Sequence, residues 1–103
     1  MTKIQYLELF QKDLQEIYNY IHDTIKNEIA ADNFVNAVEE AIINRSLFPL
    51  SAEPYKSKKK REYTYYRIYV DNYIVFYIVI EGNPTIMEVH RIIYMGRDIS
   101  GIL

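Results

Sequence analysis

The stretch IVFYIVI, from Ile74 to Ile80, constrains the fold of this chain more than any other segment. Its β-branched and aromatic side chains favour an extended strand. Successive side chains of a strand point to opposite faces of a sheet, so this strand is apolar on both faces. We therefore predict that it lies at the centre of a sheet.

Three other segments are typical of strands. Lys3–Leu9 alternates apolar and polar residues, whereas Glu62–Val70 and Thr85–Ile93 are rich in β-forming residues. Asp71-Asn72 is a two-residue hairpin signal, because both side chains tolerate positive φ. The next turn is expected at Glu81–Pro84.

Two amphipathic helices are predicted between the first strand and the other three. The apolar face of the first consists of Phe10, Leu14, Ile17, Tyr18, Ile21 and Ile25. That of the second consists of Phe34, Ala37, Val38, Ala41 and Ile42. The second helix has possible start signals at Asn27 and Asp32, and Pro49 ends it near Ser46. The helices are joined tightly, which favours an antiparallel hairpin, and Leu50–Lys60 is expected to be a loop.

The resulting order is β-α-α-β-β-β, in a single domain that spans residues 1–103. Two amphipathic helices must cover one face of the sheet. We predict an α+β fold in which a two-helix hairpin packs on one face of a mainly antiparallel four-stranded sheet. The other face is expected to be free and to carry the basic loop, alternate tyrosines and the arginines of the C-terminal strands.

Charge is unevenly distributed along the chain. Residues 1–50 hold four cations and eight acids, whereas residues 51–103 hold eight cations and six acids. With a net charge of −2, the chain differs from a strongly basic nucleic-acid-binding domain. One short run is nevertheless strongly cationic, and it is either a phosphate-binding patch or a solvated loop. It consists of Lys56, Lys58, Lys59, Lys60 and Arg61.

Aromatic and cationic side chains share one face of the predicted Glu62–Val70 strand, where alternation places Tyr63, Tyr65, Arg67 and Tyr69 together. Such a row suits single-stranded nucleic acid, because rings stack bases and cations bind the backbone. Most tyrosines in strands are nevertheless structural.

Arg91 and Arg97 bracket Tyr94 near the C-terminus. Arginines at a strand end are either salt-bridged to neighbours such as Asp98 or available to stabilise a phosphoryl transition state without metal. The chain has no cysteine, no glycine-rich phosphate loop and no ligand cluster at metal spacing. Neither a metal nor a cofactor is therefore expected.

The two histidines, His22 and His90, are interpreted as packed or hydrogen-bonded residues. No apolar run approaches the ~20 residues of a membrane span. The first residues, MTKIQYLELFQKD, lack the apolar run of a signal peptide. We expect a cytoplasmic protein without membrane contact.

Four segments carry a resemblance to a known family. They are DLQEIYNYI (Asp13–Ile21), LFP (Leu47–Pro49), YRIYVDNYIVFY (Tyr66–Tyr77) and VHRIIYMGRD (Val89–Asp98). In order and spacing they resemble the RelE/ParE superfamily of type II toxin–antitoxin toxins, nearest the ParE-like branch also labelled plasmid stabilisation proteins. The resemblance covers nearly the whole chain.

The resemblance implies one of two activities. RelE-type toxins cut mRNA in the ribosomal A site, whereas ParE-type toxins poison DNA gyrase. A nuclease of this family is expected to use Arg97, Arg67, Tyr94 and Lys60 in catalysis. The expected nucleic-acid contacts are Lys56, Lys58, Lys59, Arg61 and Arg91.

Tyr94 stands where many members of the family have a histidine. Tyrosine can donate a proton or stack on a base, but with an ordinary pKa near ~10 it is a poor general base at neutral pH.

We expect a toxin that is neutralised by a cognate antitoxin protein encoded beside it. The favoured activity is that of a metal-independent, ribosome-dependent mRNA endoribonuclease, in which a 2′-hydroxyl attacks the adjacent phosphate. The alternatives are a DNA gyrase inhibitor and an inert member that only binds its antitoxin. Only the nuclease requires Arg67, Tyr94 and Arg97 to converge on one phosphate.

Overall fold

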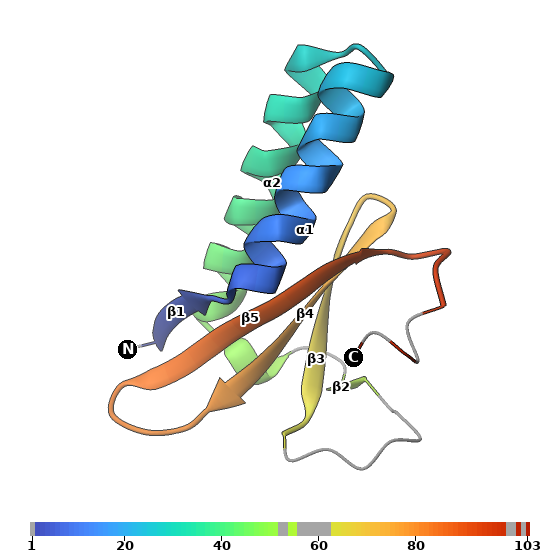
Figure 1. The fold of residues 1–103 in the computed structure, drawn as a ribbon. Coiled ribbons are helices and arrows are strands. Elements are labelled where there is room, and N and C mark those ends of the chain that lie inside the picture. Colours follow the sequence, from blue (N-terminus) through green and yellow to red (C-terminus); the bar gives the residue numbers. More distant parts are fainter. Residues whose placement is uncertain (1, 52–53, 56–62, 99–100, 102) are drawn as a thin grey trace.

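A five-stranded sheet and a pair of helices make up the computed structural model of this chain, which describes residues 2–51, 54–55, 63–98, 101 and 103 (Figure 1). The strands are β1 (Thr2–Tyr6), β2 (Pro54–Tyr55), β3 (Tyr65–Val70), β4 (Tyr73–Ile80) and β5 (Thr85–Tyr94). Their spatial order is β1-β5-β4-β3-β2. β1 runs parallel to β5, and every other pair is antiparallel.

The helices are α1 (Glu8–Asn19) and α2 (Glu28–Ser46). A π-helical turn at Tyr20–Thr24 follows α1, and a 3-10 turn at Pro49–Ser51 follows α2. The two helices run antiparallel over one face of the sheet, and their connected end extends past the strands (Figure 1). The predicted α+β class, element order and helical hairpin are confirmed.

β4 is the central strand, as predicted, because it pairs with β3 on one side and β5 on the other. Val75 and Tyr77 point into the main core beneath the helices, whereas Ile74 and Phe76 are buried on the opposite side. We call that opposite side of the sheet the far face. It is not free, as the sequence led us to expect, because a small apolar cluster covers part of it. That cluster consists of Ile74, Phe76, Ile93, Tyr55, Tyr65 and Leu103.

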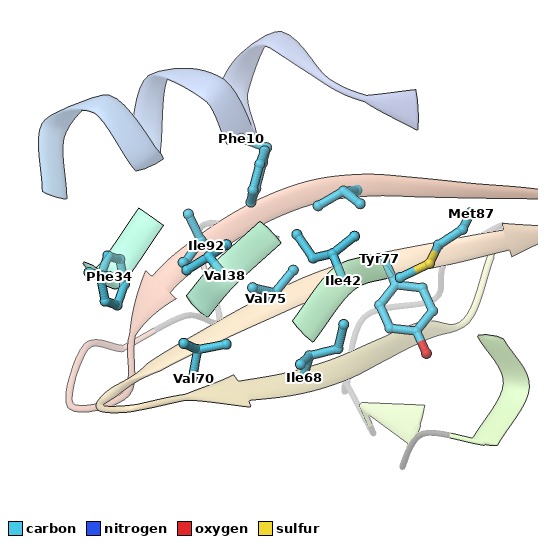
Figure 2. Packing of buried hydrophobic residues seen from close by; sticks show 11 residues of the cluster. Phe10, Phe34, Val38, Ile42, Ile68, Val70, Val75, Tyr77, Met87 and Ile92 are labelled. Carbon is cyan, nitrogen blue, oxygen red and sulfur yellow. The ribbon is translucent and has the colours of Figure 1, made fainter. Parts of the chain in front are cut away.

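The main core lies between the helices and the sheet (Figure 2). Phe10 comes from α1, and Phe34, Val38 and Ile42 come from α2 at the spacing of one helical face. The strands contribute Ile68, Val70, Val75, Tyr77, Met87, Val89 and Ile92. Alternation along β3 therefore sends Tyr66, Ile68 and Val70 to the helices and leaves Tyr65, Arg67 and Tyr69 on the far face.

Local signals explain where α2 begins and ends. Of the two possible start signals, Asn27 is the N-cap, and its Oδ1 accepts a hydrogen bond of 3.0 Å from the Ala30 N–H. The helix ends at Ser46, three residues before Pro49, as predicted. The Asp71-Asn72 hairpin is also confirmed, with Asp71 at a φ of 50°.

Two expectations about boundaries were wrong. β1 ends at Tyr6, because the Leu7 carbonyl accepts from the Gln11 N–H and starts α1, so that Leu9 is an exposed helical residue. The segment Leu50–Lys60 was expected to be a loop, but Pro54–Tyr55 pairs with β3 and makes a fifth strand. None of the described helices combines the length and apolarity needed to cross a bilayer.

Candidate functional site on the far face of the sheet

Three polar side chains on the far face form a hydrogen-bonded chain. His90 Nε2 lies 2.7 Å from Glu88 Oε1, and His90 Nδ1 lies 2.9 Å from the Tyr65 hydroxyl. Because a carboxylate only accepts, Nε2 carries the proton in the first bond, and Nδ1 of a neutral ring then accepts from Tyr65. Glu88 and His90 are largely shielded, with 21% and 18% of their side chains exposed.

β3 and β5, which lie on the two sides of β4, position these three hydrogen-bonded side chains. Tyr65 begins β3, and its ring lies edge-on to both Phe76 and His90, with centroids 6.4 and 5.2 Å apart. Glu88 and His90 are two residues apart on β5, so they project from the same face of the sheet. Buried Phe76 of β4 forms the floor between them.

Arg67 lies beside these three side chains, on the same face of β3 as Tyr65. Its Cζ is 5.9 Å from the centroid of the Tyr55 ring and 5.8 Å from that of Tyr69. Rings at this distance hold a guanidinium by cation–π attraction. Arg67 and Tyr65 are two residues apart on one strand, so their backbones are separated by about 7 Å. The far face thus combines a cation, a polarised hydroxyl and an imidazole–carboxylate pair.

Arg91 pairs with Phe76 of the far face, but its guanidinium lies against α1. Its Nε and Nη2 donate to the two carboxylate oxygens of Asp13, at 2.7 and 2.8 Å. Donation of these hydrogen bonds to the Asp13 carboxylate raises the pKa of the Arg91 guanidinium. The arginines of the C-terminal strands were expected on the face away from the helices; Arg91 pairs with a residue of that face, but its guanidinium is bound by α1. Its predicted contact with nucleic acid stays a prediction.

Tyr94 and Arg97 also lie on the helical side. Tyr94 pairs with Tyr73, whose ring packs on Phe34 of α2, and the Arg97 N–H donates to the Tyr94 carbonyl at 3.0 Å. Both side chains line a shallow hollow whose other walls are Asp13, Glu16, Ile17, Tyr20, Tyr73 and Ile92. Arg67 is on the opposite face of the sheet, so this arrangement does not bring Arg67, Tyr94 and Arg97 to one phosphate.

The remaining predicted residues, Lys56, Lys58, Lys59, Lys60 and Arg61, lie outside the described residues. They follow Tyr55 of β2 in the sequence and precede Tyr63, which is exposed just ahead of β3. Among the described residues, no group of three or more histidine and acidic side chains is placed to hold a metal ion.

Sequence reasoning missed Glu88 and the assembly of His90 with Tyr65. Tyr65 was recognised as part of the aromatic row, and His90 as a hydrogen-bonded residue, but their partnership depends on the pairing of β3 and β5 with β4. The available signal was local: Glu88 and His90 are polar residues at alternate positions of a strand that is otherwise mostly apolar.

Comparisons with known proteins place this geometry in context. A family model described as the ParE toxin of type II toxin–antitoxin system, parDE, matches residues 4–99. Among solved structures, the chain is similar to one in the crystal structure of the RelB–RelE antitoxin–toxin complex from Methanococcus jannaschii. The identity is 27%, the match covers 87% of this chain and 88% of that chain, and the TM-score is 0.42. A search of curated proteins found no match.

Proposed function

Because this chain belongs to the family of ParE toxins of type II toxin–antitoxin systems, we propose that it is a toxin that cleaves mRNA on the ribosome and is neutralised by a cognate antitoxin. The far face is the proposed site of cleavage. The observation that carries this proposal is the hydrogen-bonded chain Glu88–His90–Tyr65 beside Arg67. A carboxylate, an imidazole and a hydroxyl in series can pass a proton, as cleavage by a 2′-hydroxyl requires.

In the proposed reaction the 2′-oxygen of one nucleotide attacks the phosphorus of the next phosphodiester. Its proton passes to the Tyr65 oxygen as the Tyr65 proton passes to His90 Nδ1, and Glu88 stabilises the resulting imidazolium. Negative charge grows on the phosphate oxygens, which the Arg67 guanidinium meets as a fork. The bond to the 5′-oxygen breaks, that oxygen takes a proton from water, and a 2′,3′-cyclic phosphate remains. The hydroxide that is left removes the extra proton of the His90 imidazolium through Tyr65, which restores the neutral ring.

Single-stranded RNA suits the surroundings of this site. Tyr69, on the same face of β3, has 52% of its surface exposed, and Tyr63 has 44%. Exposed rings in line with a cation favour stacking of bases along the strand. The cationic run at residues 56–61 is proposed to bind the backbone, with Lys60 close to the reacting phosphate.

The second candidate function is inhibition of DNA gyrase. The family description favours it, because ParE-type toxins are expected to act on gyrase. On this alternative the far face is a binding surface, and proton transfer through His90 has no part in toxicity. The Tyr94–Arg97 hollow is a separate proposed site for either function, since the resemblance to the family assigns it catalytic residues.

The test measures translation-coupled mRNA cleavage and gyrase supercoiling with the same purified toxin. We expect wild-type protein to cleave mRNA, and His90→Gln and Arg67→Ala to slow cleavage by about 10²–10³-fold, the usual cost of removing a preorganised group. Arg97→Ala and Tyr94→Phe are the matched variants from the helical side, and equal losses there would move catalysis to that hollow. Inhibited supercoiling with intact mRNA would replace the nuclease by a gyrase inhibitor, and inactivity in both assays would leave only antitoxin binding.

A further inference from the structure

β5 contains a bulge at His90. Phe76 of β4 pairs with Arg91, but the next residue, Tyr77, pairs with Val89, so β5 has one residue more than β4 at this point. An extra residue locally twists a strand and redirects its side chains. Here His90 points to Tyr65 on the far face, and Arg91 points to Asp13 of α1.

The edge of β5 changes partner at the same place. β1 pairs with β5 as far as Val89, whose carbonyl accepts from the Leu7 N–H at 3.0 Å. Beyond Val89, Asp13 binds this edge of β5, and its Oδ2 accepts from the Ile92 backbone N–H at 3.2 Å. The same carboxylate holds both prongs of Arg91, and only 13% of the Asp13 side chain and 18% of the Arg91 side chain are exposed. Asp13 therefore binds the strand on the C-terminal side of the bulge.

We propose that Asp13 is a positioning residue for the far-face site, acting through the bulge in β5. With Arg91 and Ile92 held against α1, the extra residue of β5 can only be His90. Without the Asp13 contacts Arg91 can become the extra residue, so that His90 pairs with Phe76, the partner of Arg67. His90 then stays on the far face but moves along the strand, away from the Tyr65 hydroxyl.

This inference rests on the proposed function for its catalytic consequence but not for its structural one. The simpler alternative is that Asp13 and Arg91 only join a helix to the sheet. On that alternative their loss lowers stability and leaves His90 where it is. A measurement on His90 itself separates the two.

The experiment records the imidazole 15N signals of His90 by NMR in the full chain, beside the cleavage assay. Wild-type protein is expected to show one tautomer, with the proton on Nε2. Asp13→Asn removes one acceptor oxygen and the charge, and Arg91→Lys keeps the charge but loses the two-pronged geometry. In both variants we expect the His90 signals to show mixed tautomers and kcat to fall about 10–100-fold, with KM changed less than twofold.

Two controls make the result specific. Glu16→Gln removes a carboxylate from the same helix without removing a hydrogen bond to Arg91, and Ile42→Val lowers stability from the core. Both are expected to keep wild-type His90 signals. Unchanged His90 signals in Asp13→Asn and Arg91→Lys would overturn the inference. If wild-type protein cleaves no RNA, the NMR comparison still decides whether Asp13 positions His90.

Discussion

The hydroxyl of Tyr77 joins three parts of the chain, namely β4, the 3-10 turn and the end of α2. Its ring is fully buried in the main core, and its hydroxyl donates to the carbonyl of Pro49 in the 3-10 turn. Arg45, at the end of α2, donates to the same hydroxyl at 3.4 Å and to the Arg67 carbonyl at 3.1 Å. The backbone beneath the proposed catalytic Arg67 is thus tied to both α2 and the turn that follows it.

Tyr77→Phe should lower the free energy of unfolding by about 1–3 kcal/mol, because the Pro49 carbonyl loses its donor. The loss should be smaller at high pH, since burial raises the pKa of the Tyr77 hydroxyl. The unfolded chain releases this proton first, so the tyrosine's contribution is fully present below about pH 10 and is lost as the pH rises through the folded pKa. Urea denaturation at pH 8 and above pH 10 measures both effects.

Tyr69→Phe is the matched control, because Tyr69 is half-exposed on the far face. The other tyrosines with raised pKa values, Tyr6, Tyr18 and Tyr73, are present in both proteins and cancel in the comparison. Equal pH dependence of Tyr77→Phe and wild-type protein would contradict the assignment of this contribution to Tyr77.

At the scale of elements, the start of α2 depends on one side chain. Asn27→Ala should destabilise the protein by about 1 kcal/mol, because the Ala30 N–H loses its acceptor at the N-cap. Asn27→Asp should keep most of the stability, since aspartate caps equally well. The midpoint of thermal or urea unfolding measures the difference. A change as small as that of Asn36→Ala, an exposed position inside the same helix, would show that the cap contributes nothing.

The elements that could be predicted are those whose signals are local. Asn27 and Pro49 bracket α2, Asp71 turns the β3–β4 hairpin, and the all-apolar run Ile74–Ile80 identifies the central strand without knowledge of its neighbours. Leu9 misled the prediction, because an exposed leucine in the first turn of a helix continues the alternation of the strand before it.

What could not be predicted depends on contacts between distant segments. The bulge in β5 is a property of its pairing with β4. The Arg91 guanidinium and the Ile92 N–H donate to Asp13, which lies 78 residues from Arg91 in the sequence. The sequence therefore indicated Tyr65, Arg67 and Tyr69 correctly as one face, but not that the Arg91 guanidinium is bound by α1. The chain Glu88–His90–Tyr65 required the same pairing.

At the scale of the whole molecule, charge differs between the two halves of the sequence. The acidic half forms β1 and the helices, and the cations of residues 56–61 precede in sequence the strand that carries Arg67. Replacing Lys58, Lys59 and Lys60 by alanine should weaken RNA binding and reduce the slope of log K against log salt by about 2, because three phosphate contacts to a single strand are lost.

A salt titration of binding to single-stranded RNA measures that slope. Replacing Lys3, Lys12 and Lys26 by alanine removes the same charge from the N-terminal half and serves as the control, with an expected slope close to that of wild-type protein. Equal slopes for the two triple variants would show that the run is only solvated.

The parallel pairing of β1 with β5 sets the order in which this protein can be finished as it is made. β1 is made before the helices, but its partner β5 is made after the helices and the β3–β4 hairpin. β1 therefore cannot pair until β5 has been made. In the same way, Tyr65 can bind His90, and Asp13 can bind Arg91, only after β5 has been made. The proposed site therefore does not exist on the growing chain until β5 has been made, and the toxin cannot act before that point.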